Sequence, residues 1–111
     1  LEFKMRSSDM ILGLPWNIAF YALMLKFYCH CLDYEPFKLS CSLTDAHIYK
    51  NHIDGLDTLL SRSESLFPFP NLEISGIDKS LPFEKIIESV SEKNFILKNY
   101  KCNDPIEFKL N

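Results

Sequence analysis

Polar side chains that could bind a small anionic molecule occur at two places in the first half of the chain. Arg6 and Ser7 are adjacent, and a guanidinium beside a short hydroxyl supplies the donors that a phosphate group needs. Asp45, His47 and Tyr49 occupy alternate positions, so in a regular strand they project from one face. By residue type alone, Arg6 is more often a solvated surface charge, and His47 and Tyr49 are more often satisfied structural groups. Residue types therefore indicate two candidate sites without deciding that either binds a ligand.

The strand expected to carry the second group changes character at Asp45. Apolar and polar residues alternate over residues 37–44, which is the period of a half-buried strand. At Asp45 the pattern inverts, and Asp45, His47 and Tyr49 continue the face that was apolar through Leu43. A β-bulge that turns these side chains out to water is one interpretation, and the pattern alone favours it. The other interpretation is a pocket that opens at this end of the strand.

The remaining patterns predict one long helix, two shorter helices and further strands. Residues 1–12 favour a strand, Pro15 suits the first turn of a helix, and residues 17–32 are almost all apolar. Because a membrane span needs about 20 apolar residues and Lys26 interrupts this run, we expect a buried core helix. Amphipathic helices are predicted over 51–62 and 83–90, and strands at 72–74, 95–97 and 106–110. The predicted fold class is α+β, with a mixed or antiparallel sheet packed against the long buried helix and the two shorter helices.

Composition restricts the partners and the compartment. The chain has 111 residues, 47% of them hydrophobic, so we expect part of its apolar surface to meet another segment or subunit. The net charge of -3, spread along the chain, argues against a nucleic-acid partner. Glu2 and Lys4 would interrupt a signal peptide, and Leu1 is interpreted as lying within a longer gene product.

The four cysteines give no metal-binding spacing. They are Cys29, Cys31, Cys41 and Cys102, without a C-x-x-C pair or a paired histidine motif. Neighbouring positions of a helix diverge by about 100°, so Cys29, His30 and Cys31 cannot all face one ion. We therefore expect reduced thiols, a cytoplasmic location and no metal.

Two longer segments give the polar residues a context. Residues 6–21 read R-S-S-D-M-I-L-G-L-P-W-N-I-A-F-Y and resemble the R-S-x-D-x-x-L-G-x-P-F-N-I-A-x-Y signature of thymidylate synthases. Residues 45–52 read D-A-H-I-Y-K-N-H and are similar to that family's D-x-H-I-Y-x-N-H. A weaker likeness covers residues 60–74. The resemblance thus covers residues 1–75 well and implies the α+β fold of that family.

The resemblance implies a pocket for a pyrimidine deoxynucleotide. Arg6 and Ser7 would contact the phosphate of dUMP, and His47 and Tyr49 would hold the ribose 3′-hydroxyl. Asn17 would recognise uracil, because its amide both donates and accepts. Without the family, Asn17 near a helix start would be interpreted as an N-cap worth about 1 kcal/mol.

The resemblance also implies a folate co-substrate, 5,10-methylenetetrahydrofolate. Asp9 would lie between nucleotide and folate, help to bind the pterin and orient water, so that Asp9 and Asn17 support catalysis. Gly13 would let the backbone approach the cofactor ring. Without the family, Asp9 is a solvated charge and Gly13 a turn residue. The last eight residues lack the small apolar residues that close over the folate in this family.

The implied reaction is the reductive methylation of dUMP to dTMP in a homodimer, a step of nucleotide biosynthesis. Its cysteine nucleophile lies upstream of the R-S-x-D motif, and no cysteine precedes Arg6. We therefore interpret residues 1–111 as the C-terminal part of one domain, inactive alone and partnered by a missing N-terminal segment. Alternatives are a pyrimidine deoxynucleotide hydroxymethylase of the same superfamily and a non-catalytic nucleotide-binding or scaffold remnant. Asn17 favours uracil over cytosine, for which the family would place Asp there.

Overall fold

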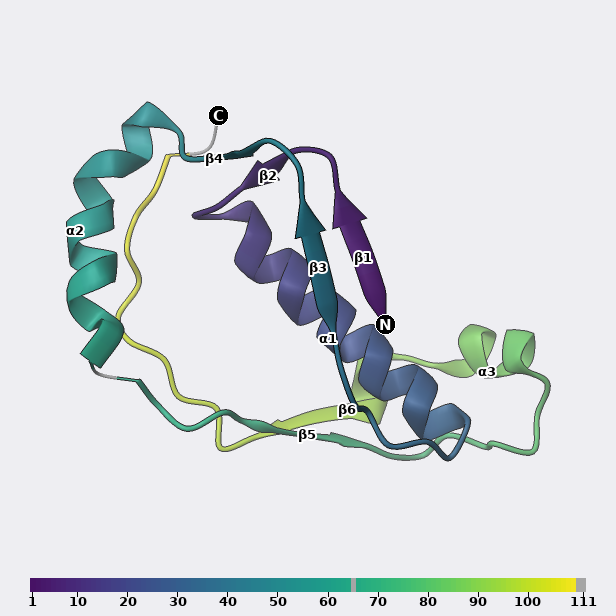
Figure 1. Ribbon diagram of the computed structural model, residues 1–111. Coiled ribbons are helices and arrows are strands. Elements are labelled where there is room, and N and C mark those ends of the chain that lie inside the picture. Colours follow the sequence, from purple (N-terminus) through teal and green to yellow (C-terminus); the bar gives the residue numbers. More distant parts are fainter. Residues whose placement is uncertain (65, 110–111) are drawn as a thin grey trace.

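The computed structural model of the chain describes residues 1–64 and 66–109, and it arranges three short pairs of strands around one long helix (Figure 1). Helix α1 runs from Gly13 to Cys31. The strands are β1 (Glu2–Met5), β2 (Ser8–Asp9), β3 (Ser40–Leu43), β4 (Ala46–His47), β5 (Asn71–Ile74) and β6 (Phe95–Lys98). β1 pairs with β3 and β2 with β4, both in parallel, and β5 pairs with β6 in antiparallel orientation. The α+β class is confirmed.

The prediction of a single sheet is wrong, because the strands of the described residues form three separate pairs. The β1 and β3 register begins with Glu2 opposite Ser40, so the predicted strand begins only at Ser40. Before it, the Lys38 carbonyl accepts a hydrogen bond from the Leu1 ammonium at 2.9 Å, without forming a ladder. The first predicted strand is likewise divided at Arg6 and Ser7. Its apolar end, residues 10–12, is a turn into α1. The alternation of apolar and polar residues identified segments that can form strands. Where a strand begins and ends also depends on which neighbouring strand it pairs with.

Helix α1 begins earlier than predicted and is less buried. Pro15 lies in its first turn, as expected, but the helix starts at Gly13 rather than at residue 17. Its buried residues are Leu14, Phe27 and Cys31, whereas Trp16 is 79% exposed. The expectation of a buried core helix is thus not met, because the described elements fully bury only these three residues of a helix that is apolar nearly all round. No helix within the described residues is long and apolar enough to cross a membrane.

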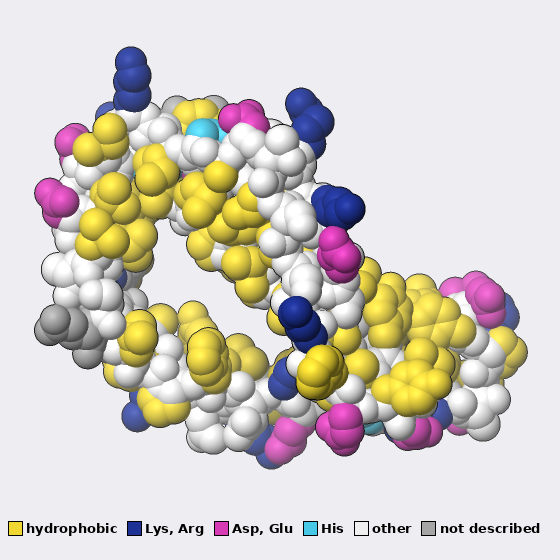
Figure 2. All heavy atoms as spheres, viewed as in Figure 1, with side chains coloured by type: hydrophobic (Ala, Val, Ile, Leu, Met, Phe, Trp, Pro, Cys, Tyr) yellow, Lys and Arg dark blue, Asp and Glu magenta, His cyan; other side chains and the backbone are white. Residues whose placement is uncertain are grey.

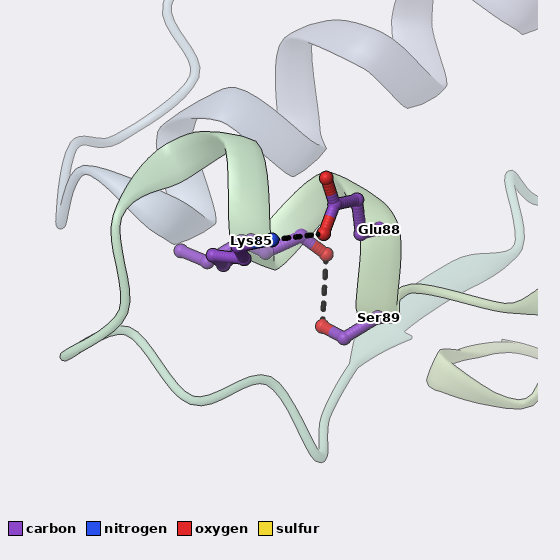
Figure 3. Close-up of polar contacts among 4 residues, drawn as sticks. Lys85, Glu88 and Ser89 are labelled. Atoms are coloured by element: carbon purple, nitrogen blue, oxygen red, sulfur yellow. Dashed lines mark hydrogen bonds and ion pairs between the residues drawn. The ribbon is translucent and has the colours of Figure 1, made fainter.

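The apolar core lies at the C-terminal end of α1. Phe27 and Cys31 pack against Ile86 of α3 (Phe83–Ser89), the helix predicted after Pro82. Five partly buried residues surround them: Tyr28, Ile74, Ile77, Val90 and Phe95. Two contacts support α3: the Lys85 ammonium lies 2.7 Å from the Glu88 carboxylate, and Ser89 Oγ donates to the Ile86 carbonyl at 2.9 Å (Figure 3).

The other predicted amphipathic helix is α2 (Ile53–Ser61), which follows the short 3-10 helix η1 (Lys50–His52) and precedes η2 (Arg62–Glu64). The strand predicted over 106–110 is absent through Lys109, and Leu110 lies outside the described residues. Residues 102–109 instead run as an extended segment beside α2 (Figure 1). Figure 2 shows an opening through the molecule between α2 and α1, with hydrophobic side chains on its walls.

Candidate functional site

Asp9 caps the N-terminus of α1 with its side chain. Its Oδ1 accepts hydrogen bonds from the backbone N–H groups of Ile11 (3.0 Å) and Leu12 (3.4 Å), and its Oδ2 accepts from Gly13 (3.3 Å). Burial by itself would raise the pKa of Asp9, but these three bonds, with a smaller contribution from His52, lower it below its usual value. The carboxylate is therefore held in its charged form at the positive end of the helix.

Asp9, Gly13 and Asn17 lie together at this end of α1. A methyl group on Gly13 would lie 3.3 Å from Asp9 Cβ and 3.8 Å from Asn17 Oδ1. Asn17 is half-buried in the second turn of the helix and Leu12 is the N-cap, so the interpretation of Asn17 as an N-cap is wrong. Asp9 performs that function, which leaves the Asn17 amide for other contacts.

The second predicted group lies next to Asp9 through strand pairing. Asp9 stands opposite His47 in the β2 and β4 register, and Met10 N–H donates to the His47 carbonyl at 3.0 Å. The His47 and Tyr49 rings meet edge to face with centroids 5.1 Å apart. The two motifs, which residues 22–44 separate in the sequence, are thus neighbours in space.

The inversion of the pattern at Asp45 corresponds to an interruption of the strand. β3 ends at Leu43, Asp45 adopts a left-handed φ of 50°, and β4 resumes at Ala46. His47 Nδ1 lies 2.9 Å from the Asp45 carbonyl, which holds the imidazole against the bend. Asp45 is exposed, as the bulge interpretation expects, but His47 is half-buried. Tyr49 is exposed as well, so of the three side chains only His47 is partly covered.

Arg6 and Ser7 are exposed in the turn between β1 and β2. Two backbone hydrogen bonds hold this turn beside the bend between β3 and β4: Thr44 N–H donates to the Met5 carbonyl at 2.8 Å, and Ser8 N–H donates to the Asp45 carbonyl at 3.1 Å. Arg6 takes part in none of the ion pairs found within residues 1–64 and 66–109. Its guanidinium is therefore available to an anion from solvent.

This region also contains two buried polar residues, Ser8 and His52, for which the sequence predicts no role. Ser8 is fully buried and His52 is 1% exposed. In the part of the chain that the structure describes, Ser8 Oγ and His52 Nδ1 have no hydrogen-bond partner. The His52 ring meets Tyr49 edge to face with centroids 5.6 Å apart. The position of His52 at the end of the D-x-H-I-Y-x-N-H segment was the available signal.

Two hollows of the surface lie outside this cluster. One of about 480 Å³ is lined by Leu12 and residues 106–109. Another, of about 450 Å³, lies near the opposite end of α1 and is lined by residues that include Leu1, Cys29 and Phe37. The predicted site residues line neither, so the candidate site rests on the polar cluster. Within the described ranges, no group of three or more His, Cys, Asp or Glu side chains could hold a metal ion.

The cluster at the start of α1 is of a class of site suited to a small polar ligand. It combines a charged carboxylate, an amide, an imidazole and a phenol. Comparison with known proteins identifies the family of the chain. The family model described as thymidylate synthase matches residues 1–111, and the chain belongs to the thymidylate synthase family. The match extends past residue 75, where the resemblance of the motifs ends.

Curated relatives support the same assignment. The chain is 37% identical over 105 residues to a thymidylate synthase of Aster yellows witches'-broom phytoplasma, which covers 93% of this chain and 33% of that protein. It is 36% identical over 105 residues to the thymidylate synthase of Saccharomyces cerevisiae, covering 95% and 32%. A bifunctional dihydrofolate reductase-thymidylate synthase of Glycine max is 38% identical over 109 residues, covering 98% and 19%. The chain thus spans about a third of the length of the single-function relatives.

Proposed function

We propose that the chain supplies the dUMP-binding part of a thymidylate synthase, which converts dUMP to dTMP with 5,10-methylenetetrahydrofolate. The observation that carries the proposal is the meeting of the two motifs, where Asp9 lies opposite His47 and beside Asn17. Relatives named thymidylate synthase, which are 36–37% identical to the chain over 105 residues, support the proposal. The chain would occur in the cytoplasm as part of a homodimer.

Each polar residue of the cluster has a role that its chemistry suits. The exposed Arg6 guanidinium and Ser7 hydroxyl would bind the dUMP phosphate, since charge-assisted contacts to phosphate are strong. The Asn17 amide would pair with the uracil edge and reject cytosine, whose donor and acceptor are exchanged. His47, with Nδ1 directed to the Asp45 carbonyl, would offer Nε2 together with the Tyr49 hydroxyl to the ribose 3′-hydroxyl.

Asp9 and Gly13 differ in how well they fit a folate. A carboxylate has about four acceptor directions, and Asp9 uses three of them on the backbone, so one remains for a pterin N–H or a water. Gly13 fits less well, because a methyl group there would meet the Asp9 side chain rather than open space. When bound, the folate would provide the one-carbon unit and the reducing equivalents.

The attacking thiolate would come from outside these 111 residues. Cys31 is buried, which raises its thiol pKa and keeps it protonated, and it lies at the end of α1 opposite Asp9. Cys29 lies on the same distant turn, and Cys41 lies on β3. We therefore propose that the chain alone is inactive and acts together with the remaining two thirds of a synthase.

Exchange of Asn17 tests the role in base recognition. With the upstream portion of a synthase present, the chain should bind dUMP more tightly than dCMP by about tenfold or more, since a mismatched buried hydrogen bond costs about 1–3 kcal/mol. Asn17→Asp should reverse that preference, as measured by calorimetry with both nucleotides. The control is Asn71→Asp, the same chemical change on the exposed start of β5, which should leave the preference unchanged. Equal binding of both nucleotides by the parent would contradict the proposal.

A further inference from the structure

The segment Asp104–Lys109, called the strap here, is fastened along α2 from end to end. At one end Arg62 Nη1 donates a hydrogen bond to the Asp104 carbonyl at 2.5 Å. At the other end His52 Nε2 lies 2.8 Å from the Lys109 carbonyl, which makes Nε2 the protonated nitrogen of the ring. The strap therefore lies against η1, α2 and η2, although its residues form no strand.

Between these two contacts, Phe108 occupies a space that exists only because residue 55 is glycine. A Cβ on Gly55 would overlap the Phe108 ring, and would lie 2.9 Å from Cζ and 3.2 Å from Cδ1. Glycine in a helix interior is less favourable than alanine, so its presence in α2 calls for a local reason. The close approach of the ring is such a reason.

His52 joins the two parts of this contact. Its ring is 1% exposed and meets the Phe108 ring edge to face with centroids 5.3 Å apart. The same imidazole donates to the strap backbone, so one buried side chain contacts both the ring and the carbonyl of adjacent strap residues. A buried N–H that lost the Lys109 carbonyl would be costly, which favours the docked strap.

We propose that Gly55 and His52 form a latch that positions the strap as one wall of the hollow beside Leu12. Ile106, Glu107, Phe108 and Lys109 line that hollow, and Leu12 lies in the turn that Asp9 caps. The strap would thus border the folate side of the nucleotide pocket, and this assignment of a ligand rests on the proposed function. The latch itself requires no ligand, and Gly55 and His52 are positioning residues rather than catalytic ones.

Trypsin cleavage at the Lys109–Leu110 bond reports on the latch in the full chain without any nucleotide. The protease must hold the Lys109 carbonyl itself, so cleavage requires that this carbonyl leaves His52. Gly55→Ala should raise the rate of this cleavage about tenfold, because the added methyl displaces the ring. Thr58→Ala, an exposed change on the same helix, should leave the rate unchanged, and cleavage after Lys98 of β6 should be unchanged in both variants.

A second variant separates displacement of the ring from damage to the helix. Phe108→Ala should raise cleavage at Lys109 by itself, and Gly55→Ala added to it should have no further effect, since no ring remains to be displaced. Equal rates in the parent and Gly55→Ala, or additive effects in the double variant, would overturn the latch. If Gly55→Ala unfolds the chain, cleavage after Lys98 rises too, and Phe108→Ala alone then decides. Because no dUMP is present, failure of the latch is distinct from failure of the nucleotide pocket.

Discussion

At the C-terminal end of α1, Phe27 and Cys31 are buried against Ile86, whereas at its N-terminal end Trp16 and Phe20 are 79% and 57% exposed. The first end contains the apolar core of the described chain, with aromatic rings from α1, α3 and β6 in contact. The second end carries the candidate site, and backbone pairing and the Asp9 cap hold it together. One end is stabilised by burial and the other by directed polar contacts.

The difference between the two ends of α1 indicates where the rest of a synthase would pack. Apolar side chains around the site end, and on the walls of the opening in Figure 2, lack cover from the described residues. The C-terminal end of α1 needs no such addition to bury Phe27. We infer that the remainder of a synthase would pack at the site end, which is also where the nucleophile is required.

The largest expected effect is on activity. The chain alone should form no dTMP and should self-associate, because the attacking thiolate is absent and the site end is uncovered. Addition of the upstream portion of the Saccharomyces cerevisiae relative should bring both a soluble complex and dTMP formation, measured by light scattering and by chromatography of the product. The control is the same portion with its nucleophilic cysteine changed to serine, which should restore solubility only. Formation of dTMP by the chain alone, or a monodisperse monomer in light scattering, would contradict the comparison.

A smaller effect on stability distinguishes the two ends of α1. Phe27→Ala should lower the free energy of unfolding of the chain by about 3 kcal/mol, as expected for a buried phenylalanine. Trp16→Ala should change it by less than about 0.5 kcal/mol, because that side chain is exposed. Urea titration followed by circular dichroism measures both. Equal losses would mean that both ends are packed alike.

The smallest effect concerns the cap at the site end. Asp9→Asn should lower the stability by about 1 kcal/mol at pH 7, since it removes a charge at the helix N-terminus. The folded pKa of Asp9 is lowered, so its contribution is complete above the unfolded value of about 3.9 and is lost as the pH falls through the folded value. The gap between parent and variant should therefore close below about pH 3.9. Asp57→Asn on the exposed face of α2 should show no such gap at either pH.

The sequence by itself determined the elements whose signals are local. Pro15 and the apolar run over 17–32 predicted α1, and the spacing after Pro82 predicted α3. Leu72 with Ile74 located β5, and the apolar run over 95–97 located β6. These follow from residues within a few positions of one another, and helix and strand periods depend only on such neighbours. The two motifs likewise indicated the family, which the family model then confirmed.

Only the tertiary structure decided which residues meet. Asp9 rather than Asn17 caps α1, Ser8 and His52 are buried, and residues 106–109 of the predicted strand belong instead to the strap beside α2. These outcomes depend on contacts between residues far apart in the chain, which the local sequence pattern does not indicate. The predicted burial of α1 is wrong for the same reason. The apolar composition of the helix indicates that it should be buried, but not whether other residues of this chain bury it.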